Sequence, residues 1–470
     1  MIPLVEFPEL VEHYAPHFTG IFSDPAFVEF KRYVSGLIVS ENKTVEGMNR
    51  LFVHESRNQS SLNRLLTRSP FSVEALNEAR LAVLGSVPGT QMKPRGALSV
   101  DDTLLPHYGR QFEHIAYLFD PAEGCYTWAH NLVTLHYSDD ETDYPVLFEL
   151  WKPVDLERLE AGLVAAGIPL KDGKQGLKEA APEKWRSYLV GVWRRHQKKP
   201  EVAALYDSKL TIAQQLITRW VQAHPDANWP VTFDSWYTQP AFCRYLDKAL
   251  GVSYVGSPDT QNEVLLKGIR TPLADFAHQL KEEHRAALQE GLPPVFRLTT
   301  IRYRGERETY YSYCQTHRIH NFGRVRLVIS HRHEDLSDDP KFTMTNHLRW
   351  QAAGILRIRR HRWPVEVYHE EGKAEGLAQY QLRDFEAIYR HIALVAVVYS
   401  LLRAAQHDPA LRDKLQRELK LELDGSAAFW RRTSQAQSLW NLALFIGAGL
   451  AHGHSLRQLM APFLRAVCAL

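Results

Sequence analysis

The sequence has few cysteines, and they lie far apart. Its four cysteines, Cys125, Cys243, Cys314 and Cys468, contain no CxxC pair. A small disulfide-stapled scaffold needs closely spaced, paired cysteines, so this pattern argues against one. We expect a chain that works in a reducing compartment.

Long hydrophobic runs and a strong net charge are also missing. The longest apolar runs, residues 392–402 and 440–451, fall short of the roughly 20 residues that a membrane-spanning helix needs. We interpret them as buried helices. The first residues carry glutamates rather than the basic start of a signal peptide. These features predict a soluble, cytoplasmic protein with no membrane partner.

The charge balance restricts how the chain can bind nucleic acid. It has 56 Lys and Arg against 54 Asp and Glu, a formal net charge of +2. A polybasic surface over the whole molecule is therefore excluded, and any nucleic-acid surface must come from local clusters of cations.

The 470 residues are enough for more than one domain. Residues 1–92 read as helical: 24–39 has apolar residues at helical spacing after Asp24, and 69–85 starts with Ser and Pro and ends in Gly. Residues 54–68 are polar and basic, typical either of a small DNA-contacting helix or of a solvated one.

After residue 93 strands and helices interleave, which predicts an α/β or α+β fold. The pattern predicts, in order, a strand at 96–109, two strands in 125–153 around an acidic loop, helix over 154–223, strand–Asp–helix–strand over 228–259, a helix at 271–291 and a β-rich stretch at 295–333. That β-rich stretch has eight arginines against two glutamates. The chain after it is predicted to be helical to its end.

Three carboxylates stand where predicted elements begin or end. Asp102 follows one strand, Asp234 follows another, and Glu366 lies at a helix start where Pro364 suits the first turn. A rigid scaffold can bring such positions together. Converging carboxylates suit Mg²⁺, and two such ions about 4 Å apart can activate water and stabilise a leaving oxygen in phosphodiester chemistry. The alternative is that each is an ordinary turn, cap or solvated residue.

The segments around these carboxylates resemble a known family. "VDDTLLPHYG", "FDSWYTQPAFCRYL" and "RWPVEVYHEEGK" look like the three acidic motifs of DDE transposases, which are insertion-sequence enzymes with an RNase H-like core. The last motif resembles the Tyr-x2-Arg-x3-Glu-x6-Lys signature of one branch, with Arg362, Glu366 and Lys373 at that spacing. Arg359 stands where that signature has tyrosine. The resemblance covers about residues 93–405.

The resemblance implies a metal site. Asp102, Asp234 and Glu366 would be its ligands, holding two Mg²⁺ ions, with Mn²⁺ as a substitute. Asp101 competes with Asp102, and we prefer Asp102 because it directly precedes Thr103, as in the family's motif; the two aspartates take opposite faces of the strand.

The glutamate position has its own competitors. Glu370 shares the helix face of Glu366, whereas Glu371 points elsewhere. The resemblance also implies that Arg359, Arg362 and Lys373 bind DNA phosphates at the cleaved end.

The resemblance further implies a domain order and a reaction. The expected fold is an RNase H-like α/β core with a β-rich insertion and helical ends. Its expected parts are an N-terminal DNA-binding region (1–92), the first part of the core (93–258), a linker helix and β-rich insertion (259–354), the second part of the core with the glutamate motif (355–405), and a C-terminal region with a possible dimer interface (406–470).

The expected reaction is cut-and-paste transposition of double-stranded DNA with terminal inverted repeats into target DNA, by a homodimer. The rivals are a DNA endonuclease or recombinase that does not transpose, a domesticated DNA-binding protein with an inactive core, and an interaction scaffold.

Three further groups have a functional and an ordinary interpretation. Strand alternation scatters the potential zinc ligands Cys314, His317, His320, His331 and His333 over both faces of a sheet, so a zinc site is not expected. Tyr310, Tyr311 and Tyr313 suit stacking on an unpaired base or packing within a small sheet. Residues 171–199 have nine Lys and Arg against three Asp and Glu, with Trp185 and Trp193 between them. They either track DNA or form an amphipathic helix with a solvated face.

Overall fold

The computed structural model describes residues 2–53, 57–423 and 425–468. Its centre is a mixed sheet with the strand order β4–β3–β1–β5–β6. The strands are β1 (Ala97–His107), β3 (Cys125–Ser138), β4 (Asp143–Trp151), β5 (Val231–Phe233) and β6 (Tyr254–Gly256). A short strand, β2 (Ala116–Asp120), pairs with the start of β3.

The directions of these strands define the fold class. β3 is antiparallel to both β1 and β4, whereas β1, β5 and β6 run parallel to one another. On one side of β1 lie β3 and β4, which are antiparallel to each other. On its other side lie β5 and β6, which are both parallel to β1. This arrangement is that of an RNase H-like sheet. The prediction of an RNase H-like α/β core is therefore confirmed.

The turn between β3 and β4 is stabilised by its own first acidic residue. Asp139 Oδ1 accepts hydrogen bonds from the backbone N–H groups of Glu141 and Thr142, at 2.7 and 2.8 Å. Such an Asx turn lets a short polar side chain replace a backbone acceptor. The predicted pair of strands around an acidic loop is thus present.

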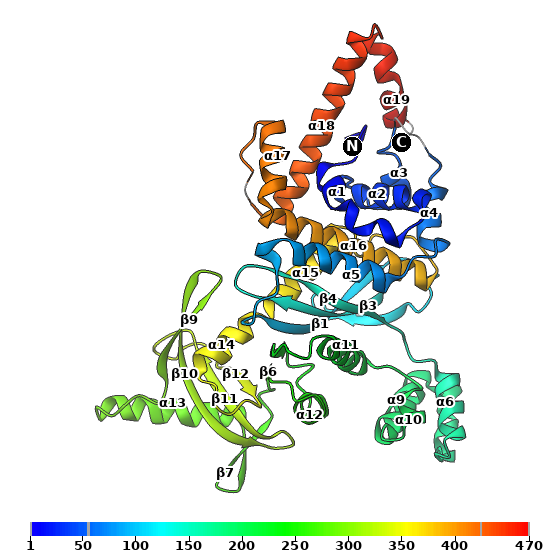
Figure 1. The fold of residues 1–470 in the computed structure, drawn as a ribbon. Helices are drawn as coiled ribbons and strands as arrows, with labels where there is room; N and C mark the ends of the chain where they lie inside the picture. The colour runs from blue at the N-terminus through cyan, green and yellow to red at the C-terminus, as the bar shows by residue number, and fades with distance from the viewer. Residues whose placement is uncertain (1, 54–56, 424, 469–470) are drawn as a thin grey trace.

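Helices from both ends of the chain cover one face of the sheet (Figure 1). They include α1 (Glu9–Tyr14), α2 (Asp24–Val39), α3 (Val45–Asn49), α4 (Ser60–Thr67), α5 (Val73–Ser86), α15 (Trp363–Ala374) and α16 (Phe385–His407), with the short helices η1 (Ala15–Ile21) and η2 (Pro88–Thr90). The helices predicted at 24–39 and 69–85 appear as α2 and α5, and Ser72 caps α5 by accepting from the N–H of Ala75 at 3.1 Å. The basic segment 54–68 contains α4; its residues 54–56 lie outside the described residues.

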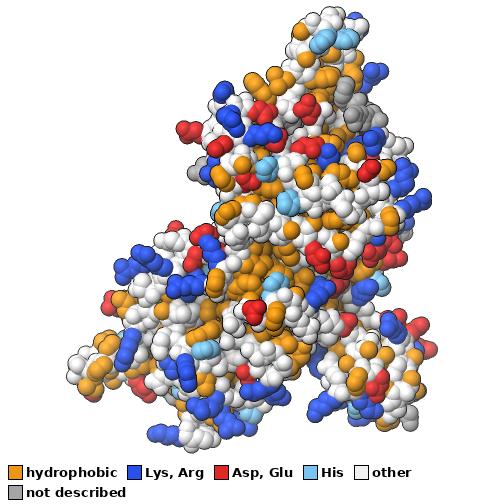
Figure 2. Space-filling model, viewed as in Figure 1, with side chains coloured by type: hydrophobic (Ala, Val, Ile, Leu, Met, Phe, Trp, Pro, Cys, Tyr) orange, Lys and Arg blue, Asp and Glu red, His pale blue; other side chains and the backbone are white. Residues whose placement is uncertain are grey.

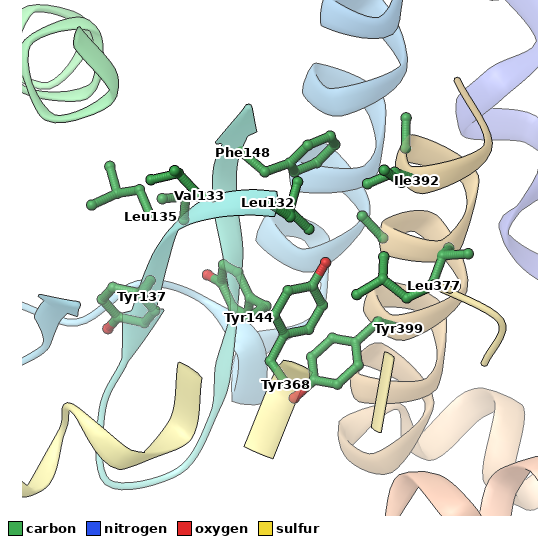
Figure 3. Packing of buried hydrophobic residues seen from close by; sticks show 14 of the residues in the cluster. Leu132, Val133, Leu135, Tyr137, Tyr144, Phe148, Tyr368, Leu377, Ile392 and Tyr399 are labelled. Carbon is green, nitrogen blue, oxygen red and sulfur yellow. The ribbon is translucent and has the colours of Figure 1, made fainter. Parts of the chain in front are cut away.

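Helix α16 is the centre of this layer. It is long and apolar enough to cross a membrane, but 83% of that apolar stretch is buried inside the protein, as in a core helix. Figure 3 shows its Ile392 and Tyr399, with Tyr368 of α15, packed among side chains of β3 and β4. The rings of Tyr368 and Tyr399 meet edge to face at 4.9 Å.

The other face of the sheet carries α11 (Lys209–Ala223), followed by β5, α12 (Pro240–Arg244) and η3 (Tyr245–Ala249). The helix predicted over 154–223 is broken into several helices. Between β4 and α11 lie α6 (Leu156–Ala165), α7 (Asp172–Gln175), α8 (Leu177–Ala180), α9 (Pro182–His196) and α10 (Pro200–Ala203). These five helices, which we call the helical lobe (residues 156–203), enclose a separate apolar cluster that includes Trp185 and Trp193.

The β-rich insertion extends the sheet of the core. Its elements are β7 (Glu263–Leu266), β8 (Ile269–Pro272), α13 (Leu273–Gln289), β9 (Arg297–Tyr303), β10 (Glu306–Ile319), β11 (Gly323–His331) and β12 (Lys341–Thr345), and α14 (Ala352–Arg360) follows. Because β12 pairs with β6, core and insertion share one twelve-stranded sheet. The prediction that the chain is helical from residue 334 on is wrong at β12, since this short strand is specified by its neighbours β11 and β6 rather than by its own pattern.

The C-terminal segment is helical, with α17 (Pro409–Leu419), α18 (Ala427–Ala451) and α19 (Leu456–Cys468). Helices α18 and α19 form a hairpin that projects from the helical layer (Figure 1). It exposes Leu439, Trp440, Leu444, Leu450, Leu456 and Leu464.

Candidate active site

Strand β1 turns its two neighbouring aspartates to opposite faces of the sheet. Asp101 lies opposite Thr134 of β3, and Asp102 lies opposite Val133. Directly paired residues point to the same face, and Thr134 Oγ1 lies 3.1 Å from Nε2 of His369 on α15. Asp101 therefore faces α15, the helix that carries Glu366, while Asp102 faces α11.

On its own face, Asp102 is surrounded by hydrogen-bond donors. It accepts from Asn131 Nδ2 at 2.7 Å, from Lys209 Nζ at 2.8 Å and from the Tyr237 hydroxyl at 2.9 Å. Lys209 also lies over the ring of Trp236, 4.3 Å from its centre. This carboxylate is thus engaged in fixing Lys209 and Tyr237, and the geometry favours Asp101 over the predicted Asp102 as the β1 member of the acidic site.

Asp101 has few partners of its own and a strongly perturbed acidity. Its side chain is 16% exposed, and its Oδ2 lies 3.6 Å from Arg362 Nη1. Burial raises the pKa of Asp101 to about 8, and the nearby charges of Asp234 and Asp102 add to the rise. Burial and neighbouring carboxylates disfavour the negative charge of Asp101 more than Arg362 stabilises it.

Asp234 follows the end of β5, as the sequence predicted. Its Oδ1 accepts from the backbone N–H of Tyr237 at 3.1 Å, which closes a turn. Burial raises the pKa of Asp234, and the charge of Asp102 adds to this, whereas two backbone N–H groups and the Arg362 guanidinium oppose it.

Glu366 lies in the first turn of α15, beside Pro364. Its carboxylate pairs with Arg362, one turn earlier, and its side chain is 32% exposed. Arg362 therefore bridges Glu366 and Asp101 and also acts on Asp234. Asp101 of β1 and Glu366 of α15 thus pair with one guanidinium, and Asp234, just after β5, lies within reach of its charge.

The donor set of this cluster fits a hard divalent cation. Among the residues that the structure describes, no group of three or more His, Cys, Asp or Glu side chains is close enough to hold a metal ion. However, the available donors are carboxylate oxygens, which Mg²⁺ and Mn²⁺ prefer. Burial raises the pKa of Asp101, and the neighbouring carboxylates Asp234 and Asp102 add to the rise, so a cation bound beside it would favour its ionised form. A divalent ion bound here would compete with Arg362 for the same oxygens.

The pH dependence of stability tests this reading of Asp101. An acid whose pKa is raised by folding binds its proton more tightly in the folded protein than in the unfolded chain, so stability falls as pH rises from about 4 to about 8. With EDTA present, we expect the urea midpoint of the wild type to fall across this range more steeply than that of Asp101→Asn. Equal slopes would contradict the assigned pKa.

The predicted phosphate-binding residues differ in availability. Lys373 is exposed and lies about two turns after Glu366, on the same side of α15. Arg359 is only half-buried, but its guanidinium donates to Thr343 Oγ1 at 3.0 Å, and burial lowers its pKa.

Of the competing glutamates, Glu370 is exposed, and Glu371 pairs with Arg403 at 3.1 Å.

Several of the other candidate residues pack within the protein or bind one another. Tyr310 and Tyr313 are 7% exposed, which favours packing over base stacking. Tyr313 also bonds to His317 Nε2 at 2.8 Å. Trp185 and Trp193 are buried in the helical lobe, which favours the amphipathic-helix interpretation for these two side chains.

Lys209 is a site residue that sequence reasoning missed. It is the first residue of α11, after Ser208, whose hydroxyl accepts from the N–H of Thr211 at 3.2 Å. That cap gave a local signal for the helix start. No local signal places the Lys209 side chain against Asp102, because the two residues are joined only by the fold.

Two family profiles match the chain. Residues 17–278 match the DDE superfamily endonuclease family, and residues 205–401 match the transposase DDE domain. No curated protein matches the sequence. One similar solved structure is a piggyBac transposase synaptic complex with hairpin DNA, at 10% identity and a TM-score of 0.41, covering 94% of this chain and 78% of that one.

The endonuclease profile spans more than half of the chain, and the chain belongs to the DDE superfamily. Together with the transposase domain, this confirms the predicted class: the protein is a DDE transposase, an enzyme of DNA transposition. The branch with the Tyr-Arg-Glu-Lys signature stays a prediction.

Proposed function

We propose that this transposase cuts DNA at the ends of an insertion sequence with divalent metal ions held by Asp101, Asp234 and Glu366. The convergence of these carboxylates around Arg362 supports the assignment. In this proposal Asp102, the residue first expected from the sequence, holds Lys209 in place instead.

The metal is Mg²⁺, with Mn²⁺ as a substitute, and two ions are expected. When bound, they supply an activated water or 3′-hydroxyl and stabilise the leaving oxygen. The residues of the chain do the rest. With these carboxylates engaged in holding a cation, Arg362 would be free to bind the phosphate under attack. Lys373 contacts a neighbouring phosphate from the same side of α15, and Arg359, at the end of α14, contacts a phosphate as well.

The substrates are double-stranded DNA with terminal inverted repeats and then target DNA, in a cut-and-paste reaction. The protein acts as a homodimer on DNA, because two ends must be brought together. We place it in the cytoplasm at the nucleoid. A DNA endonuclease or recombinase that does not transpose would use the same carboxylates, and strand transfer into target DNA separates the two.

The experiment is a cleavage assay on DNA that ends in the repeats flanking the gene, with Mg²⁺, Mn²⁺ or EDTA. Wild type is compared with Glu366→Gln and with Glu370→Gln, a matched change at an exposed position of the same helix. We expect metal-dependent nicking at the repeat boundary by wild type and Glu370→Gln, and none by Glu366→Gln. Equal cutting by all three would reject the role of Glu366. Binding without cutting by the wild type would favour a DNA-binding protein with an inactive core.

A further inference from the structure

The helical lobe is an independently packed unit beside the core. Eight buried apolar residues form its own cluster: Leu159, Leu163, Ile168, Trp185, Leu189, Val192, Trp193 and Val202. The chain enters the lobe after β4 and returns to the core at α11. Figure 1 shows α6, α9 and α10 set apart below the sheet. Its apolar side chains are used for its own stability, so its outer surface is available for a partner.

Helix α9 divides this lobe into an inner and an outer face. With about 3.6 residues per turn, its buried residues Trp185, Leu189, Val192 and Trp193 make one stripe. The opposite side carries Lys184, Arg194 and Arg195, all exposed. Ser187 and Gly191 lie between them on that side. The outer face thus has cations about 15 Å apart with small residues between, where a rod-like polyanion can approach closely.

The cations on this face are not neutralised by the protein. Elsewhere in the lobe, Lys178 pairs with Glu160 at 2.9 Å. Within the described part of the chain, no carboxylate pairs with Lys184, Arg194, Arg195 or Lys198, which follows the end of α9. Figure 2 shows Lys and Arg side chains at the edges of this lower right lobe.

The composition of the face favours DNA over a protein partner. No large apolar side chain of α9 is exposed among the described residues, whereas protein interfaces depend on buried aromatic or aliphatic anchors. Free Lys and Arg on a polar surface are the groups that contact phosphates without reading sequence.

The lobe is also joined at its exit to the sheet of the core. The chain leaves α10 through Tyr206, whose hydroxyl accepts from Trp151 Nε1 of β4 at 3.1 Å. It then reaches Lys209, whose ammonium pairs with Asp102 at 2.8 Å on the α11 face of the sheet, opposite the face of Asp101. The lobe is therefore attached to the sheet that carries the candidate carboxylates, through the residue next to Asp101 in the chain.

We propose that the outer face of α9, with Lys184, Arg194, Arg195 and Lys198, binds the phosphate backbone of the duplex that extends from the active site. This inference rests on the proposed function, because it takes DNA at the carboxylates as its reference point. The contact is sequence-independent and acts through release of counterions.

The test uses full-length Arg194→Gln/Arg195→Gln protein and a duplex that holds one repeat end with flanking DNA. The matched control is Arg417→Gln/Arg457→Gln, which removes the same charge from exposed positions of α17 and α19, at the other end of the molecule (Figure 1). Dissociation constants are measured from about 0.05 to 0.3 M KCl. Each lost phosphate contact changes the slope of log K against log salt by about 0.9. We expect a slope shallower by about 2 and an affinity lower by roughly ten- to a hundredfold at 0.1 M salt, while the control binds like wild type.

Different outcomes separate this inference from the proposed function. Wild-type slope and affinity in Arg194→Gln/Arg195→Gln would overturn the contact, even if the wild type cuts DNA normally. Binding that depends on α9, without any metal-dependent cutting by the wild type, would uphold the contact and reject the proposed function. If the double variant melts below the wild type, Lys184→Gln/Lys198→Gln carries the same test, because both side chains are exposed.

Discussion

Asp101→Asn is expected to abolish DNA cleavage, whereas Asp102→Asn, one residue away, leaves measurable activity. Asparagine keeps the shape of the side chain but removes the negative charge that holds a metal ion. Metal ions contribute several kcal/mol of transition-state stabilisation, and about 1.4 kcal/mol corresponds to a tenfold change in rate. We therefore expect a loss on the order of 10³-fold in the single-turnover rate of nicking for Asp101→Asn.

Asp102→Asn provides the matched control. It removes the charge that pairs with Lys209 at 2.8 Å and keeps an acceptor oxygen for only one of Tyr237 and Asn131. We expect roughly a tenfold loss, in line with changes to groups that orient a metal site. A complete loss in Asp102→Asn together with an active Asp101→Asn would reverse the assignment and restore the residue first expected from the sequence.

Asp143→Ala is expected to cause the largest loss of stability among single substitutions in the core. Asp143 is buried in the first position of β4 and pairs with Arg304 at 2.6 Å and with Arg403 at 3.4 Å. It also accepts from the Tyr399 hydroxyl at 3.0 Å. These charges and hydrogen bonds hold the pKa of Asp143 far below its usual range, despite its burial.

Removing this buried carboxylate would leave Arg304 without its counter-charge and Arg403, whose side chain is 14% exposed, with Glu371 as its remaining partner. Breaking a buried ion pair from one side costs about 3–5 kcal/mol, and we expect that loss in the free energy of unfolding, measured with urea. Asp140→Ala is the control on the same turn: its side chain is 45% exposed and pairs with Arg357 at 2.7 Å. Exposed pairs contribute about 1 kcal/mol or less, so similar losses in the two variants would contradict the network.

Local sequence signals predicted the parts of the fold that depend on near neighbours. Helix α2 and the strands around the acidic turn have clear periodicity, and they appear where expected. Strand β12 and the continuity of core and insertion in one sheet depend on pairing between distant segments. The hairpin β7–β8 was missed as well, although its turn at Lys267 and Gly268 has the positive φ angles typical of a tight hairpin.

The candidate site likewise has one part that local sequence signals predict and one part that depends on distant segments of the chain. The sequence placed Asp234 and Glu366 at element ends because strand ends and helix starts leave local signals. The choice between Asp101 and Asp102 depends on which helix covers which face of the sheet. Alternation along a strand says only that the two side chains point to opposite faces. The covering helix α15 is contributed by a segment far along the chain, so the neighbouring residues carry no information about it.

The position of α16 has a consequence for how the enzyme is made. This helix packs against α5 and α2 from the start of the chain, and against β4 of the sheet. A ribosome completes the N-terminal helices and the strands that bear Asp101 and Asp234 long before it reaches residue 385. Until then, the apolar surfaces that α16 covers in the folded protein stay exposed, and chaperones can bind them. The segment that brings Glu366 is also synthesised late, so a chain that ends before it has neither a finished core nor a complete set of carboxylates, and nuclease activity begins only once the chain has been made through α16.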